Sequence, residues 1–132
     1  MSTQRILIVD DDQAILLTLA ASIEKVNPTY EVVTCKSGEE ALTHIANCRF
    51  ALLLTDYSMP GMNGLDLARV VQERSPETRI IMMTAYGSDT LRAQAAELNL
   101  SDFIDKPFTV KEIRDVINRV MSDIAATPHT PV

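Results

Sequence analysis

The fold of this chain is decided by residues 50–64, which read FALLLTDYSMPGMNG. Residues 50–54 form an unbroken apolar run, which is typical of a parallel strand covered on both faces. Asp56 follows almost at once, so its carboxylate is expected at the carboxyl end of that strand, the edge where open α/β sheets bind ligands. The loop beyond it holds a proline and two glycines, which permit unusual backbone angles beside the acid. Taken alone, Asp56 is also compatible with an ordinary turn residue.

On either side of this stretch, short apolar runs alternate with segments of helical periodicity. Helix starts are indicated by Ser37 with Glu40 and by Thr109 with Glu112, which are capping-box pairs. Helix ends are indicated before Pro28 and Pro76. The expected strands are residues 5–9, 30–35, 50–54, 79–84 and 103–104, and the expected helices are residues 15–26, 37–47, 65–74, 88–98 and 109–124. Such alternation predicts an α/β fold, a doubly wound parallel sheet with helices on both faces.

The composition fits one globular domain. The chain has 132 residues, of which 46% are hydrophobic and 23% charged, and no apolar run of transmembrane length. Its net charge of −6 argues against direct nucleic acid binding, which needs clustered Lys and Arg, and no membrane association is expected. Cys35 and Cys48 have no metal-ligand spacing, so both are predicted to be reduced and partly buried, in a protein of a bacterial-type cytoplasm.

Polar residues collect where the expected strands end. The acids Asp10, Asp11 and Asp12 follow the first strand, Asp56 the third, Thr84 the fourth and Lys106 the fifth. In a doubly wound sheet the first and third strands are neighbours, so these acids should face one another. Crowded carboxylates resist joint ionisation unless a cation joins them, and oxygen ligands without His or Cys favour Mg²⁺. The sequence therefore predicts a magnesium site at this edge.

Each of these residues also has an ordinary interpretation. Asp12 is suited to cap the first helix, which would leave Asp10 and Asp11 for the metal. Thr84 alone is a β-favoured residue at a strand end, and Lys106 alone is a solvated surface lysine. Only their ordered placement on one edge of the sheet makes the set a specific indication of a functional site.

The ordered set resembles the response-regulator receiver domain of two-component signalling, from Arg5 to about Met121. The matching pieces are Asp10 and Asp11 after the first strand, Asp56 before residues 58–64, Thr84 before Ala85, and Lys106 before Pro107 and Phe108. The resemblance implies the flavodoxin-like strand order 2-1-3-4-5. Residues 1–124 are expected to form the receiver domain, and residues 125–132, which hold two prolines, are expected to be a flexible tail or the start of a linker.

The resemblance further implies a chemistry. Asp56 would be the phosphoacceptor for a phosphohistidine of a histidine kinase or phosphotransfer protein. Asp11, Asp56 and the backbone carbonyl of Ser58 would bind Mg²⁺ directly, and Asp10 would act largely through water. Thr84 and Lys106 would contact the phosphoryl group, and the bond between Lys106 and Pro107 would be cis. Such a domain is no conventional enzyme, although it catalyses its own Mg²⁺-dependent phosphorylation and dephosphorylation.

A conformational switch is implied as well. When Thr84 moves toward the phosphate, Phe103 on the fifth strand would turn inward to fill the space, and the surface of the fourth helix, fifth strand and fifth helix would carry the output and a homodimer contact. Many relatives have Tyr where this chain has Phe103, so packing alone would bias the switch. The alternative is that Phe103 is a fixed core aromatic. Asn99 follows the fourth helix and is suited to a left-handed helix stop.

Three other functions compete with this interpretation. Asp10 and Asp12 also match the alternating acids of haloacid-dehalogenase-like phosphatases, although the further acidic pair after the lysine is missing. A flavin or nucleotide module could use the same fold, but it would need a small, phosphate-cradling first loop instead of three acids. The third alternative is a receiver fold that serves as a scaffold and is never phosphorylated.

Overall fold

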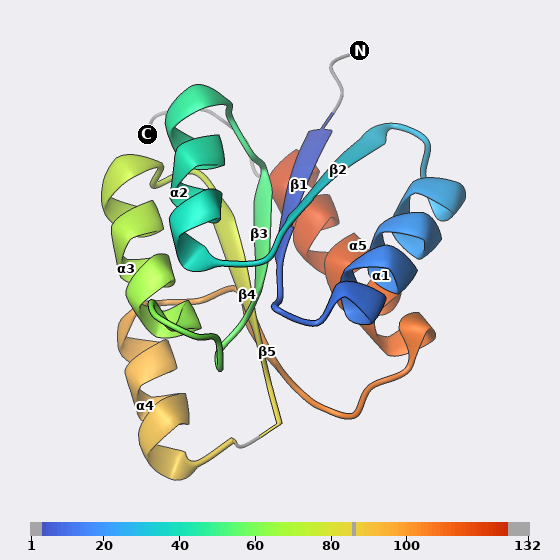
Figure 1. Ribbon diagram of the computed structural model, residues 1–132. Coiled ribbons are helices and arrows are strands. Elements are labelled where there is room, and N and C mark those ends of the chain that lie inside the picture. The colour runs from blue at the N-terminus through green and yellow to red at the C-terminus, as the bar shows by residue number, and fades with distance from the viewer. Residues whose placement is uncertain (1–3, 86, 127–132) are drawn as a thin grey trace.

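A five-stranded parallel sheet forms the centre of the molecule (Figure 1). The computed structural model describes residues 4–85 and 87–126. The strands lie in the order β2-β1-β3-β4-β5, which confirms the flavodoxin-like, doubly wound topology expected from the sequence. Their bounds are Gln4–Val9 for β1, Tyr30–Cys35 for β2, Leu52–Asp56 for β3, Arg79–Thr84 for β4 and Asp102–Asp105 for β5.

Helices cover both faces of the sheet. One face carries α1 and α5, and the other carries α2, α3 and α4 (Figure 1). The helix bounds are Gln13–Val26 for α1, Gly38–Asn47 for α2, Gly64–Arg74 for α3, Asp89–Glu97 for α4 and Val110–Ala126 for α5. Every residue of β3 is buried, as its continuous apolar run predicts for a strand between two helical layers.

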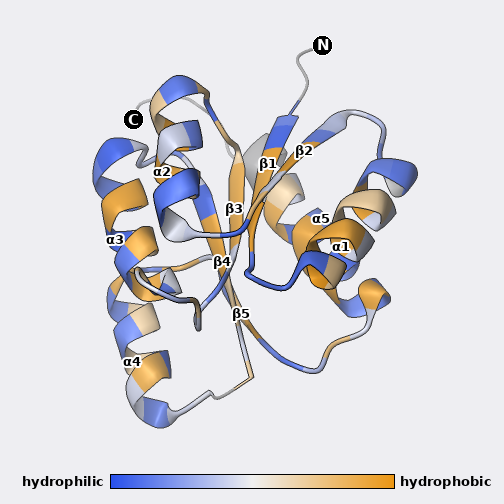
Figure 2. Ribbon diagram, viewed as in Figure 1, coloured by the Kyte–Doolittle hydropathy of each residue, from blue (hydrophilic) through white to orange (hydrophobic). Residues whose placement is uncertain are grey.

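Two hydrophobic cores result from the alternation of side chains along the strands. Leu53 and Met82 belong to the core under α2, α3 and α4, whereas Leu54 and Met83 belong to the core under α1 and α5. Figure 2 shows the apolar colour concentrated on the central strands and on the helix surfaces that face them. Together these cores hold the strands in one register, so the residues that follow the strands are brought to one edge of the sheet.

Side-chain caps begin each helix in the described part of the chain, including α5, where the Thr109 hydroxyl accepts from the Glu112 amide at 3.1 Å as the sequence predicted. The Asp12 carboxylate accepts hydrogen bonds from the amides of Ala14 (2.9 Å) and Ile15 (3.4 Å), so Asp12 does cap α1. Ser37, Asn63 and Ser88 cap α2, α3 and α4 in the same way. The predicted capping box of α2 forms only in part. The Ser37 hydroxyl accepts from the Glu40 amide, but the Glu40 carboxylate accepts from the amide of Lys36, one residue before the cap.

Several expected boundaries shift by a residue or more. β3 starts at Leu52 and includes Asp56, whose register partner on β4 is Met83, so Asp56 ends the strand instead of following it. α5 continues to Ala126, beyond the expected end at residue 124. The expected tail was residues 125–132, of which 127–132 lie outside the described residues.

The cysteine and helix-stop predictions have mixed outcomes. Both cysteines are free, as predicted. Cys35 is buried, but Cys48 is exposed, so the expected partial burial is wrong there, because Cys48 is the residue at which α2 ends. Asn99 has φ +57°, which confirms the left-handed conformation after α4.

The loop between β3 and α3 depends on two glycines for different reasons. Gly61 has φ +78°, a conformation that favours glycine. At Gly64 the constraint is space, because a Cβ atom there would lie 2.3 Å from the Asp56 carbonyl oxygen. The Gly64 amide also donates to the Tyr57 carbonyl at 2.8 Å. This loop therefore folds back tightly on the backbone of the acid.

Replacing Gly64 by alanine should destabilise the protein, although alanine normally favours a helix start over glycine. The added Cβ would meet backbone atoms of Asp56 and Tyr57, which cannot move without distorting β3. We expect a loss of about 1–3 kcal/mol in the free energy of unfolding, measured by urea denaturation.

Gly38→Ala is the matched control, because Gly38 is likewise the first residue of a helix. Its added Cβ would press on the Met62 side chain, which can adjust, so its loss should be clearly smaller. Equal losses in the two variants would show that the close approach of Gly64 to the Asp56 backbone is not the cause of the lost stability.

Candidate functional site

Three carboxylates meet at the carboxyl edge of the sheet. β1 and β3 are adjacent parallel strands in which Val9 pairs with Thr55, so Asp10 and Asp56 come to neighbouring positions. One carboxylate oxygen from each of Asp10, Asp11 and Asp56 lies within 4.8 Å of the others. Asp10 and Asp56 are 1% and 5% exposed, whereas Asp11 is exposed to solvent. The structure thus brings together the acids that the sequence predicted would face one another.

Lys106 bridges the two buried acids. Its Nζ lies 3.1 Å from Asp10 Oδ2 and 3.2 Å from Asp56 Oδ1. Its backbone amide donates to the Thr84 carbonyl at 2.7 Å, which continues the pairing of β4 with β5. The peptide bond from Lys106 to Pro107 is cis, as the resemblance implied. The side chain of Lys106 is therefore directed into the acidic cluster and is not an ordinary surface lysine.

Burial and charge set the proton affinities at this site. The pKa of Asp56 is raised because burial disfavours its charged form and because Asp10 adds a like charge, with Lys106 opposing both. For Lys106, burial acts to lower the pKa, but the hydrogen bonds and charges of Asp10 and Asp56 outweigh burial and leave the pKa raised. Lys106 consequently stays protonated at neutral pH, and one lysine does not fully compensate the anions around it.

Thr84 ends β4, the strand beside Asp56. It is 1% exposed, and its register partner on β5 is Asp105. The residue before it, Met83, pairs with Asp56, so Thr84 lies one position further toward the carboxyl edge. Ala85, the next residue, is small and exposed.

Phe103 lies on the same face of the sheet as Thr84. Its register partner is Met82, two residues before Thr84, and side chains alternate along a strand. The ring is half-buried and lines a hollow of about 270 Å³ beside α4. Phe103 is therefore not a fully enclosed core aromatic in this structure, and its inward movement stays a prediction.

The donor set of the cluster fits a hard divalent cation. All three groups are carboxylates, and no His or Cys belongs to the cluster. Over residues 4–85 and 87–126, no other group of three or more His, Cys, Asp or Glu side chains is arranged to hold a metal. Ser58 is exposed in the loop two residues beyond Asp56, and its carbonyl as a fourth ligand stays a prediction.

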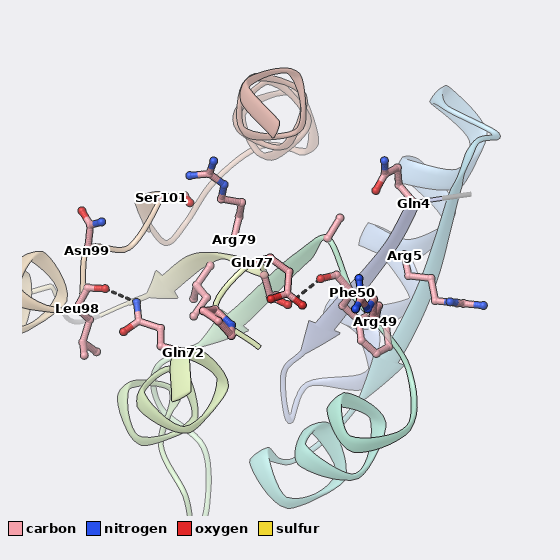
Figure 3. Close-up of a pocket in the computed structure, with 14 residues that line it drawn as sticks. Gln4, Arg5, Arg49, Phe50, Gln72, Glu77, Arg79, Leu98, Asn99 and Ser101 are labelled. Atoms are coloured by element: carbon pink, nitrogen blue, oxygen red, sulfur yellow. Dashed lines mark hydrogen bonds between the residues drawn. The ribbon is translucent and has the colours of Figure 1, made fainter. Parts of the chain in front are cut away.

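A larger hollow, which the sequence did not predict, lies at the opposite edge of the sheet. It has a volume of about 840 Å³ and is lined partly by Arg5, Arg49 and Arg79 (Figure 3). Figure 3 shows Arg79 directed away from Arg5. Arg79 is aligned with Ile6 through Leu52, so Arg79 and Arg5 have their side chains on opposite faces of the parallel sheet. Arg5 is also paired with Glu31 at 3.6 Å. The hollow lies at the amino ends of the strands, whereas the acidic cluster lies at their carboxyl ends.

Comparison with known proteins identifies the family. Residues 6–118 match the family model of the response regulator receiver domain. Because this match covers most of the chain, the protein belongs to the response regulator receiver domain family. Members of this family act in two-component signalling, where they interact with histidine kinases or phosphotransfer proteins, and they are generally not conventional enzymes.

Individual relatives agree with this assignment. Sporulation initiation phosphotransferase F of Bacillus subtilis is 31% identical over 121 residues, which cover 92% of this chain and 96% of that protein. A CheY-like receiver domain protein of Methanospirillum hungatei superposes with a TM-score of 0.89 at 31% identity, covering 94% of this chain and 98% of that one. TrrA of Thermotoga maritima, solved in complex with Mg(2+)-BeF, gives a TM-score of 0.77 at 28% identity, covering 89% and 98%.

Other relatives are much longer than this chain. The chain spans only 24% to 44% of the length of four transcriptional and response regulators that it matches. Among the described residues, no helix has the length and apolar character needed to cross a bilayer.

Asp56→Asn should stabilise the metal-free protein at pH 7. The substitution removes a buried charge that repels Asp10, and we expect a gain of roughly 1 kcal/mol in the free energy of unfolding. Because the folded-state pKa of Asp56 is raised, ionisation of Asp56 costs stability as pH rises through that pKa. The stability gain of Asp56→Asn should therefore shrink as the pH falls below the folded-state pKa of Asp56. Urea denaturation in EDTA across pH 4–7, roughly the range in which carboxyl groups titrate, would measure this.

Adding Mg²⁺ should make the wild type more stable than Asp56→Asn, which reverses the order expected without metal. A cation that binds the folded state stabilises it by mass action, and the wild-type cluster has one more carboxylate to offer. Asp66→Asn on the exposed surface of α3 is the control and should respond to Mg²⁺ as the wild type does. A Mg²⁺ response that is the same in Asp56→Asn and the wild type would exclude Asp56 from the metal site.

Proposed function

We propose that Asp56 is the phosphoacceptor of this receiver domain. The donor is a phosphohistidine of a sensor histidine kinase or a phosphotransfer protein, and the reaction depends on Mg²⁺. The observation that carries the proposal is the position of Lys106, whose Nζ lies 3.1 and 3.2 Å from the carboxylates of two buried acids on adjacent strands. Charged side chains are almost never buried unless they are paired, and the carboxyl edge of an open α/β sheet is where ligands bind.

The residues present would hold the metal in a definite way. Asp11, Asp56 and the Ser58 carbonyl would be direct ligands, and Asp10 would act largely through water. When bound, Mg²⁺ would offset negative charge on the phosphoryl oxygens and on the crowded carboxylates. Three carboxylates and one lysine sum to −2, which one Mg²⁺ balances.

The transfer itself needs positioning and charge compensation. An Asp56 carboxylate oxygen attacks phosphorus, the bond from phosphorus to the donor imidazole nitrogen breaks, and the imidazole leaves with the electron pair. The product is an acyl phosphate, and no general base is needed because the nucleophile is already ionised. Lys106 is positioned to pair with one phosphoryl oxygen, and the Thr84 hydroxyl to donate a hydrogen bond to another. Hydrolysis of the acyl phosphate at the same site would be the domain's own dephosphorylation reaction.

The conformational response to phosphorylation of Asp56 is a rearrangement of one surface of the domain. As Thr84 moves toward the phosphoryl group, Phe103 turns inward, and the face formed by α4, β5 and α5 changes shape. Thr84 and Phe103 support this coupling because their side chains share one face of adjacent strands. Partner binding and a homodimer contact are proposed for this face.

The remaining features are consistent with a cytoplasmic signalling protein. Cys35 and Cys48 are free thiols, as expected in a reducing compartment. The net charge of −6 disfavours direct nucleic acid binding by this domain, so no nucleic acid or membrane partner is proposed for it. The phosphatase alternative loses support because Asp12, the second acid of its pattern, caps α1 with its side chain.

A small phosphodonor such as acetyl phosphate should phosphorylate wild-type protein in the presence of Mg²⁺. Intact-mass spectrometry should show the addition of one phosphoryl group, which alkaline hydrolysis removes. Asp56→Asn should abolish the addition, whereas Asp66→Asn should retain it. Labelling that is equally fast in EDTA would contradict the metal dependence, and labelling of Asp56→Asn would place the acceptor elsewhere.

Lys106→Met should separate phosphorylation from metal binding. Loss of the ammonium group removes one positive charge from the transition state, and we expect labelling to slow by about tenfold or more. Mg²⁺ affinity should not weaken, because the lysine competes with the cation for the same carboxylates. Labelling kinetics and calorimetric Mg²⁺ titration measure the two effects, and a large loss of Mg²⁺ affinity would show that Lys106 mainly organises the metal site.

A further inference from the structure

A charged cluster covers the ring of Phe103 on the surface between α4 and β5. The Arg92 guanidinium carbon lies 4.7 Å from the Phe103 ring centroid, within the range of a cation–π contact. The same guanidinium is held by Asp105, with Arg92 Nη2 at 2.7 Å from Oδ1 and 2.5 Å from Oδ2. One arginine thus stacks on the ring and is anchored to the strand that carries it.

We propose that Arg92, anchored by Asp105, is a positioning residue that holds Phe103 in its outward orientation and sets the threshold of the switch. This inference rests on the proposed function of Asp56 and Phe103. An inward movement of the ring breaks its contact with the guanidinium, so the Arg92 contact opposes the activated state. Phe103 has no hydroxyl group with which to hold itself outward, and Arg92 supplies that missing restraint.

The backbone connects this cluster to the proposed site. Asp105 is the register partner of Thr84 and directly precedes Lys106 in the chain. The Thr84 carbonyl accepts from the Lys106 amide at 2.7 Å. Any displacement of Thr84 or Lys106 on phosphorylation is therefore transmitted to Asp105 through the β4–β5 ladder. When Asp105 moves, the anchor of Arg92 moves with it.

A second connection comes from the loop after β4. Gly87, three residues beyond Thr84, packs against the cluster. A Cβ atom at Gly87 would lie 2.8 Å from Asp105 Oδ1, 3.4 Å from Arg92 Nη2 and 3.7 Å from Phe103 Cε1. The absence of a side chain at this position lets the loop approach the ion pair and the ring together. A movement of the loop with Thr84 therefore changes the packing around the cluster directly.

The other arginine pair of β5 provides a useful contrast. Arg119 of α5 pairs with Asp102, whose carboxylate accepts a hydrogen bond from the Phe103 amide at 2.7 Å, so this pair is anchored to the backbone of β5. Arg69 and Asp66 form a third pair on α3, with side-chain exposures of 48% and 52%, close to the 47% and 59% of Arg92 and Asp105. Arg69→Gln therefore removes a surface ion pair of matched exposure that is remote from the switch.

The test is the affinity for beryllofluoride, a mimic of the phosphoryl group, in the presence of Mg²⁺. Arg92→Gln should bind it about twofold to fivefold more tightly than wild type, as expected for loss of a cation–π contact at a partly exposed site. Arg69→Gln should bind it as wild type does. A merely structural role for Arg92 would leave affinity unchanged or weaken it, so unchanged or weaker binding by Arg92→Gln overturns the inference.

A double-mutant cycle shows whether Arg92 acts through the ring. In a Phe103→Leu background, the effect of Arg92→Gln on beryllofluoride affinity should disappear, because no ring remains to be held. An effect of equal size in both backgrounds would contradict the proposal.

The ring can be followed directly by NMR in protein with isotope-labelled phenylalanine, since the chain has only three phenylalanines. Without beryllofluoride, the Phe103 resonances of Arg92→Gln should be shifted toward their position in the activated wild type, and an absence of this shift would also contradict it.

Gly87→Ala perturbs the same cluster without altering any of its charged or aromatic side chains. The added methyl group should displace the Asp105 carboxylate and loosen Arg92. Gly87→Ala should therefore bind beryllofluoride more tightly than wild type, as Arg92→Gln does, and weaker binding would contradict the proposal.

Failure of the proposed function is distinguishable from failure of this inference. If wild type binds no beryllofluoride with Mg²⁺, the assignment of Asp56 fails. If wild type binds it and Arg92→Gln matches Arg69→Gln, only the positioning role fails.

Discussion

The structure depends on holding two buried carboxylates beside one another at the end of two adjacent strands. Asp10 and Asp56 are almost completely shielded from water, and a single ammonium group, that of Lys106, lies between them. Such an arrangement is costly, because burial and mutual repulsion both oppose ionisation, as the raised pKa of Asp56 records. A fold optimised only for stability would replace these acids with apolar groups. The two cores on either side of the sheet stabilise the register that keeps the acids together.

The same sheet that crowds the anions also connects them to the surface. Thr84 and Lys106 end adjacent parallel strands and are joined by a backbone hydrogen bond of 2.7 Å. One residue before Lys106, Asp105 anchors Arg92, which lies on the ring of Phe103. In the switch proposed above, a change of charge at Asp56 would reach the α4–β5 surface through a short path of neighbouring strand residues. This path would need no large movement of the helices, because a closely packed interior transmits small displacements.

The family resemblance implies Tyr in many relatives at the position of Phe103, and the two rings differ in the contacts that they can form. A tyrosine hydroxyl can form a hydrogen bond in the outward orientation, and a phenylalanine ring cannot. In this protein the ring is instead covered by a guanidinium held by a carboxylate of the same strand. The proposed role of Arg92 adds a charged contact to the packing that was expected from the sequence to bias the ring, and that expectation stays a prediction. Arg92 and Phe103 are 11 residues apart in sequence and on different elements, and no local pattern relates them.

Local patterns in the sequence determined the order of strands and helices, the parallel sheet, the cap at Asp12 and the left-handed conformation of Asn99. They could do so because hydrophobic periodicity, side-chain caps and backbone preferences act over a few residues. They also placed Asp10, Asp56, Thr84 and Lys106 at strand ends, so the candidate site was predictable once the sheet topology was assumed. Only the tertiary structure decided the contacts that join distant segments. These are the bridging position of Lys106, the close approach of Gly64 to Asp56 and the Arg92 contact with Phe103, each of which depends on side-chain packing across the sheet.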